Sequence, residues 1–133
     1  MKLFSLLFAV ILLPAIHVLA QVPAAGAKPK DVTVAEAEKL IKDDPKVVVL
    51  DVRTPDEFKR GHIAGAKNVD YNASDFEQQI AALDKSKTYV VHCAAGGRSS
   101  QACKTIEKVK LPSVYHMKEG FGAWDKAGKP VEK

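Results

Sequence analysis

The segment from residue 47 to residue 52, Val-Val-Val-Leu-Asp-Val, is apolar and mostly β-branched. A strand that is apolar on both faces needs cover on both faces, which is typical of the centre of a parallel sheet. The residues Thr54-Pro55-Asp56-Glu57 indicate a helix start, because a capping hydroxyl, a proline and two acids stand in the order that a first turn favours. The segment therefore predicts a buried parallel strand that leads into a helix.

The same alternation of strand and helix extends outward on both sides of this segment. Apolar runs and helical periodicity predict further strands at 31–34, 66–70, 88–92 and 113–117. Further helices are predicted at 35–43, 74–83, 98–109 and 121–126, with a capping box opening the one at Ser74. This pattern implies an α/β fold, with a parallel sheet of about five strands and helices on both faces, in one domain over 31–133.

A cysteine follows the second buried strand, in the stretch Val91-His92-Cys93-Ala94-Ala95-Gly96-Gly97-Arg98-Ser99-Ser100. Ligands bind at the carboxyl ends of strands in such sheets, and Cys93 lies at one. The small residues after it let backbone N–H groups point inward around an anion, while the helix start and Arg98 add positive charge. A thiol in that field loses its proton more easily. The loop therefore predicts a nucleophilic cysteine that acts on an anionic substrate, rather than one that only packs beside a turn.

Three motifs in order resemble those of the rhodanese-like sulfurtransferases, in their single-domain form, over residues 31–131. The loop reads Cys93-x-x-Gly96-x-Arg98-Ser99, like the active-site loop of that family. Residues 50–58 (LDVRTPDEF) with 61–66 (GHIAGA) are similar to its first motif, and 120–124 (GFGAW) with 128–131 (GKPV) to its closing motif. Ala64 departs from the pattern, because the family usually has proline in that turn.

The resemblance implies that Cys93 attacks the outer sulfur of thiosulfate, becomes a persulfide, and passes that sulfur to cyanide or another thiophilic acceptor. It implies no metal and no organic cofactor. Arg53 is expected either to line the substrate entrance or to join Asp51 in an ion pair, because the two lie on the same side of a strand end. By the same resemblance, the persulfide charge would be held by the loop N–H groups of Ala94, Ala95, Gly96, Gly97 and Arg98.

Two alternatives stay open beside a sulfurtransferase that acts on small molecules. One is a persulfide carrier or redox-sensing module whose acceptor is a protein. The other is a Cys-based phosphatase or arsenate reductase, which the spacing disfavours: four residues separate Cys93 from Arg98, where those enzymes have five. The smaller ring suits a sulfur atom better than a phosphate.

The remaining chemistry-bearing side chains are expected to be structural. His92 precedes Cys93, but adjacent strand residues point to opposite faces, so we expect a packed histidine under the loop. His62 is expected to stabilise its turn, and no partner is visible for His116. The histidines and cysteines show no spacing typical of a metal site.

Cys103 falls on the apolar stripe of the helix at 98–109, which predicts a buried core cysteine. The alternative is a resolving thiol that rescues oxidised Cys93 as a disulfide. Phe121 and Trp124 are expected to cover the sheet as core, with Phe121 as a possible wall of the active-site mouth.

The first 20 residues have the order of a secretory signal peptide, with Lys2, an uncharged apolar run, and small residues before a cleavage point after Ala20. An uncleaved membrane anchor is the alternative. Residues 21–30 are expected to be a flexible lead-in. We therefore expect an exported, periplasmic monomer without membrane attachment after cleavage, and the net charge of +4 is too small to predict a nucleic-acid partner.

Overall fold

The computed structural model describes residues 26–133, which form a five-stranded sheet of order β1-β6-β5-β2-β4 with every neighbouring pair parallel. This confirms the predicted α/β fold. The strands of this sheet are β1 (Lys30–Val32), β2 (Val47–Asp51), β4 (Lys67–Asn68), β5 (Thr88–His92) and β6 (Val114–Met117). The helices are α1 (Val34–Asp43), α2 (Pro55–Arg60), α3 (Phe76–Ala81), α4 (Gly97–Val109) and α5 (Gly120–Lys126).

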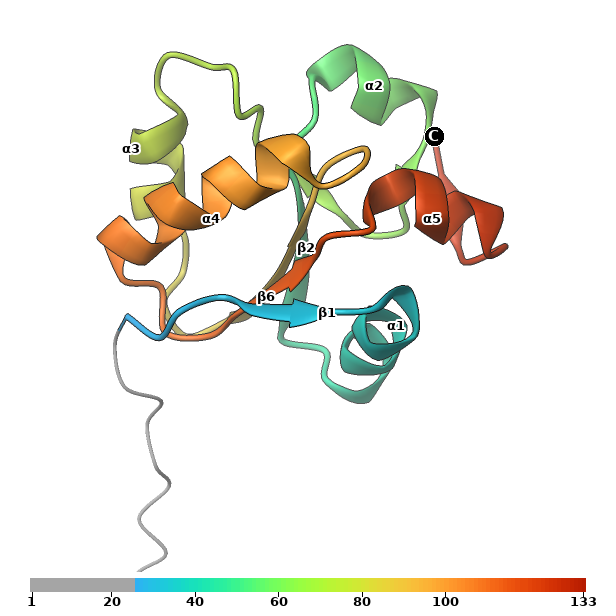
Figure 1. Cartoon of the computed structure of the whole chain (residues 1–133), viewed down its shortest axis with the longest axis horizontal. Helices are drawn as coiled ribbons and strands as arrows, with labels where there is room; N and C mark the ends of the chain where they lie inside the picture. Colours follow the sequence, from blue (N-terminus) through green and yellow to red (C-terminus); the bar gives the residue numbers. More distant parts are fainter. Residues whose placement is uncertain (1–25) are drawn as a thin grey trace, which may run out of the picture.

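Helices cover both faces of the sheet, as Figure 1 shows: α3 and α4 lie on one side, and α1 and α5 on the other. Each face has its own apolar core. Leu50, Val91 and Ile106 belong to the core under α3 and α4, whereas Val49, Val90 and Trp124 belong to the core under α1 and α5. Alternate residues of β2 and β5 thus enter opposite cores, which is why both strands are apolar throughout.

The central pair of strands ends at one edge of the sheet. In the register of β2 and β5, Asp51 stands opposite His92, and both residues are fully buried. Arg53 and Cys93, which follow these strands, are therefore brought to the same edge. Two segments that are far apart in the sequence meet there to form the site.

Of the two helix starts predicted from capping signals, the one at Thr54 is confirmed and the one at Ser74 is not. Thr33 and Thr54 each form a capping box with the glutamate three residues later. The capping box predicted at Ser74 is wrong: α3 begins at Phe76, and its N-cap residue, Asp75, makes no capping hydrogen bond. Asp75 has φ −103° and ψ 16° and accepts from Gln79 instead, because its backbone lacks the extended geometry that capping needs.

A small antiparallel sheet of β3 (His62–Ile63) and β7 (Val131–Glu132) was not predicted. Two-residue strands have no periodicity of their own, so nothing local indicates them. The predicted signal peptide, residues 1–20, lies outside the described residues, as do residues 21–25 of the predicted lead-in. Lys30, the last residue of the lead-in, begins β1. Within 26–133, no helix has the length and apolar character needed to cross a membrane.

Candidate active site

Cys93 lies between β5 and α4, in a loop whose backbone turns back toward the thiol. The Gly96 N–H donates to Cys93 Sγ at 3.1 Å. Gly96 has φ +99°, a left-handed conformation that glycine adopts without steric cost. The thiol is 1% exposed and belongs to the core under α3 and α4. The loop thus closes around the sulfur, as the sequence predicted.

The first turn of α5, together with Lys118 just before it, fixes the outer side of the loop. Phe121 N–H donates to the Cys93 carbonyl at 2.8 Å, and Gly122 N–H donates to the Ala94 carbonyl at 3.2 Å. A Cβ on Gly96 would lie 2.4 Å from the Lys118 carbonyl oxygen, so the approach of the two segments requires a glycine. This contact was not predicted from the sequence. The glycines of the closing motif are the only signal that could have indicated it.

Several hydrogen bonds act on the Cys93 thiol together. Burial raises its pKa, but the hydroxyl and N–H of Ser99 and the N–H groups of Ala95 and Gly96 lower it by more, so the pKa lies below its ordinary value. A thiolate is therefore favoured at this position, and the same donors face any charge that builds on an attached sulfur atom. The arrangement fits nucleophilic attack by sulfur.

The structure brings the predicted anion-binding residues together around Cys93, but it uses them differently. Ala95 and Gly96 supply N–H groups to the thiol. Ala94 instead accepts a hydrogen bond from Gly122 through its carbonyl, and Gly97 begins α4. That these residues bind a substrate anion stays a prediction.

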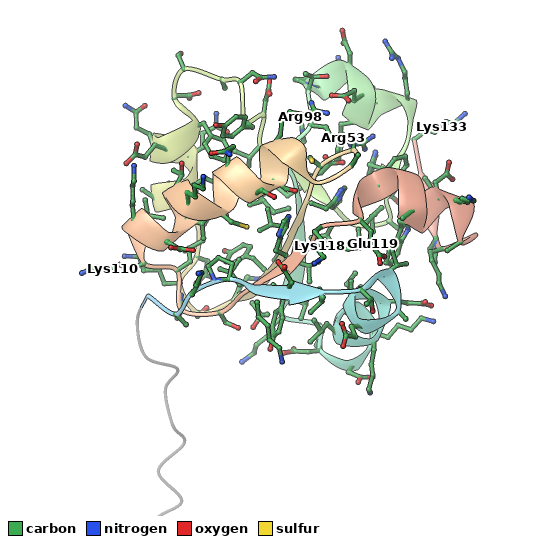
Figure 2. All side chains as sticks on the ribbon, viewed as in Figure 1. Arg53, Arg98, Lys110, Lys118, Glu119 and Lys133 are labelled. Atoms are coloured by element: carbon green, nitrogen blue, oxygen red, sulfur yellow. The ribbon has the colours of Figure 1, made fainter. Side chains whose placement is uncertain are left out.

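Arg98 has a partner that the sequence did not predict. Its guanidinium donates to both carboxylate oxygens of Glu57, at 2.7 and 2.9 Å, and the two side chains are 28% and 30% exposed. The hydrogen bond from Arg98 is the main reason that the pKa of Glu57 falls to about 2, although burial opposes the shift. Figure 2 shows Arg98 and Arg53 at the end of the sheet where the loop lies. The guanidinium expected to bind an anion is thus already paired with a carboxylate.

Arg53 forms the ion pair that was one of the two expectations for it. Its guanidinium pairs with the buried carboxylate of Asp51 at 2.6 Å, donates to the Gly61 carbonyl at 2.8 Å, and lies 4.1 Å above the ring of Phe121. It also lines a cavity of about 400 Å³ together with Glu57 and Phe121. The ion pair with Asp51 is confirmed. A role for Arg53 at the substrate entrance stays a prediction.

The expectation for His92 is confirmed, and that for His116 is corrected. His92 is fully buried and its Nδ1 lies 2.9 Å from the Cys93 carbonyl oxygen, so it packs under the loop as predicted. Burial lowers its pKa, which keeps the ring neutral. The sequence showed no partner for His116, but the structure shows two: its ring lies between Ser99 and Asp31. Its partners are distant in the sequence, so local spacing could not show them.

Cys103 is a core residue, as predicted. It is 7% exposed in the same apolar cluster as Cys93, and burial is the main cause that raises the pKa of its thiol to about 12. Both cysteines are free thiols. Among the residues described, no three or more histidines, cysteines or acids cluster in a way that could hold a metal ion.

The chain matches the family model of the rhodanese-like domain over residues 33–127. It is 35% identical over 114 residues to thiosulfate sulfurtransferase 16, chloroplastic, of Arabidopsis thaliana, covering 78% of this chain and 93% of that protein. It is 29% identical to the probable adenylyltransferase/sulfurtransferase MoeZ of Mycobacterium tuberculosis, covering 85% of this chain but only 29% of that protein. A crystal structure of a rhodanese-related protein from Thermoplasma volcanium matches with a TM-score of 0.67 and 31% identity, over 77% of this chain and 97% of that one.

An α/β domain with a buried, activated cysteine between a strand and a helix is the class that the fold and the site define. The chain belongs to the rhodanese-like domain family. Its relatives include sulfurtransferases, and they support sulfurtransferase activity for this chain.

Proposed function

We propose that the protein transfers sulfane sulfur from thiosulfate to a thiophilic acceptor through a persulfide on Cys93. The observation that carries the proposal is the Cys93 thiol itself, whose pKa is lowered by a hydroxyl and three backbone N–H groups although it is buried. Thiosulfate is the donor in the name of the Arabidopsis relative, and its charge suits a loop lined by donors.

The reaction has two displacement steps. In the first, the Cys93 thiolate attacks the outer sulfur of thiosulfate, a new S–S bond forms, the S–S bond of thiosulfate breaks, and sulfite leaves with the electron pair. In the second, an acceptor such as cyanide attacks the outer sulfur of the persulfide, thiocyanate leaves, and the thiolate is restored. The N–H groups that stabilise the thiolate are placed to stabilise the persulfide charge as well.

The test is the intact mass of the protein after exposure to thiosulfate. The wild type is expected to gain one sulfur atom and to lose it again on addition of cyanide. Cys93→Ser is expected to gain nothing, and Cys103→Ser is a matched control that should load like the wild type, since its thiol is unactivated. No gain in the wild type would exclude thiosulfate as donor, and equal gain in Cys93→Ser would exclude Cys93 as the carrier.

The rate of the second step separates an enzyme from a carrier. Rapid turnover with cyanide or a small thiol favours the small-molecule reaction proposed here. A stable, stoichiometric persulfide that small acceptors remove slowly favours delivery to a protein.

We also propose that the protein is exported and that cleavage after Ala20 leaves a mature chain beginning at Gln21. The proposal rests on the charge and size pattern of residues 1–20. The mass of the secreted protein from an exporting host tests it, because an intact leader would contradict cleavage.

A further inference from the structure

A chain of hydrogen-bonded side chains leads from the surface to the catalytic loop. Asp31 of β1 and His116 of β6 stand opposite each other in the sheet, and Asp31 Oδ1 lies 3.1 Å from His116 Nδ1. On the other side of the ring, His116 Nε2 lies 2.8 Å from Ser99 Oγ, which comes from the first turns of α4. His116 is 5% exposed and Ser99 is fully buried. Of these three side chains, only the Ser99 hydroxyl has a part in the mechanism described above, as a donor that lowers the pKa of Cys93.

The proton positions in this chain follow from what each group can do. The pKa of Asp31 is lowered, first by the hydrogen bond with His116 and also by Lys118, so this side chain is a carboxylate that can only accept. His116 Nδ1 must therefore carry a hydrogen toward it. A neutral imidazole has one N–H, so Nε2 is then bare and accepts the hydroxyl proton of Ser99.

The Ser99 hydroxyl has one proton and three acceptors in reach. His116 Nε2 lies at 2.8 Å and the Gly96 carbonyl oxygen at 3.2 Å. The third acceptor is the sulfur of Cys93, since the Ser99 hydroxyl is one of the donors that lower the pKa of that thiol. A hydroxyl that donates its proton to one acceptor cannot donate it fully to the other two. The protonation of His116 therefore decides whether the Ser99 hydroxyl can donate to the sulfur.

We propose that His116 is a positioning residue for Cys93: the neutral ring holds the hydroxyl proton of Ser99, and the protonated ring releases that hydroxyl to the sulfur. The added proton comes from solvent and binds Nε2. Nε2–H then donates to Ser99 Oγ, and the hydroxyl turns to the thiolate or the Gly96 carbonyl. No bond between heavy atoms changes. A thiolate and a protonated ring therefore stabilise each other across Ser99.

Charged groups of both signs face the ring from the elements packed against it. A cavity of about 240 Å³ beside His116 gives the ring a route to solvent protons. The titratable residues that line it with His116 are Lys28, Asp31, Cys103, Lys104, Glu107 and Lys118.

The ring tautomer in the wild-type protein is the first test, because it needs no substitution. Nitrogen-15 shifts of the His116 ring at a pH where it is neutral are expected to show a protonated Nδ1 and a bare Nε2. A neutral ring with the proton on Nε2 would overturn the proposal, since Nε2 could then not accept the hydroxyl proton of Ser99 at any pH.

The pH profile of Cys93 alkylation by iodoacetamide is the second test. The wild-type rate is expected to depart from a single titration curve between about pH 5 and pH 8, where histidines change charge. His116→Gln keeps a permanent N–H toward Ser99 and is expected to give a single curve. Ser99→Ala is also expected to give a single curve, with alkylation at pH 6 slowed about tenfold through loss of one hydrogen bond to a charged sulfur.

His62→Gln is the matched control, because His62 stacks on Phe58, pairs with Glu132, and has no hydrogen bond with Ser99 or Cys93. Its profile should follow the wild type. A wild-type profile that fits one titration, or the same change in His62→Gln as in His116→Gln, would overturn the proposal. The inference rests on the proposed function only in taking Cys93 as the reacting thiol. Both tests use the free protein, so a failure to take sulfur from thiosulfate would leave it standing.

Discussion

The two cysteines of this chain occupy one apolar cluster and have opposite protonation behaviour. Cys93 is 1% exposed and Cys103 is 7% exposed, so burial alone does not distinguish them. The pKa of Cys93 lies below its ordinary value, whereas burial raises the pKa of Cys103 to about 12. The difference lies in the donors: a hydroxyl and three N–H groups face Cys93, and no donor lowers the pKa of Cys103.

This comparison shows what a buried thiol needs in order to react. Burial penalises the thiolate at both positions, because a charge loses solvation in an apolar core. At the start of α4 the N–H groups have no partner in their own helix and can turn to the sulfur, whereas at Cys103 the helix uses them for its own hydrogen bonds. The position along one helix thus decides the chemistry of each cysteine.

The largest effect we expect is selective alkylation. At pH 8, iodoacetamide should modify Cys93 faster than Cys103 by on the order of a thousandfold or more, because the thiolate fractions differ by at least that factor. Peptide mapping by mass spectrometry after timed quenching measures both rates in one sample. Comparable rates in the folded protein would contradict the difference in thiolate fraction between the two cysteines. Equal rates in denaturant would show that the fold creates the difference.

Gly96→Ala should make Cys93 resemble Cys103 more closely. The new Cβ would lie 2.4 Å from the Lys118 carbonyl oxygen at a φ of +99°, so the loop must shift and the N–H that faces the sulfur must move. We expect the free energy of unfolding to fall by about 2 to 5 kcal/mol and Cys93 alkylation to slow. Denaturant unfolding and the alkylation rate measure the two effects.

Gly128→Ala is the matched control for that substitution. Gly128 also has a positive φ, of +69°, but nothing lies within 4 Å of its Cβ position. It should lose only the conformational cost of about 1 to 2 kcal/mol and leave Cys93 alkylation unchanged. If both variants behave alike, the close approach at Lys118 does not hold the loop.

Glu57→Gln tests the ion pair that Glu57 forms with Arg98, the arginine of the Cys93 loop. The pKa of Glu57 is lowered from 4.5 to about 2 when the protein is folded, so its stabilising contribution is present above about pH 4.5 and is lost as the pH falls toward 2. The pair is partly exposed, and we expect the variant to lose about 1 kcal/mol at neutral pH. Between pH 5 and pH 2 the wild type should lose more stability than Glu57→Gln, which thermal unfolding at several pH values measures. Equal losses of stability in the two proteins would show that the ion pair of Glu57 and Arg98 does not stabilise the fold.

The sequence was sufficient for the two central strands and for the loop after Cys93, whose signals are local. A continuous apolar run predicted β2 and β5, and the small residues after Cys93 predicted a closed loop at the end of β5. It was insufficient where two distant side chains meet. Arg98 and Glu57 are 41 positions apart and His116 and Asp31 are 85 apart, so their pairing depends on the strand order. Strand order arises from packing of the whole sheet, which no short pattern encodes.

The smallest effect we expect is that of Cys103→Ser on recovery from oxidation. A resolving cysteine must attack as a thiolate, and a thiol with a pKa of about 12 is almost wholly protonated at neutral pH. The variant should therefore recover sulfur transfer after mild peroxide and added thiol at the wild-type rate. Its stability should fall by about 1 kcal/mol, because a buried hydroxyl replaces a thiol in an apolar cluster. A variant that stays folded but fails to recover would show that Cys103 becomes activated once Cys93 is oxidised, and the contrast between the two cysteines would then hold only for the reduced protein.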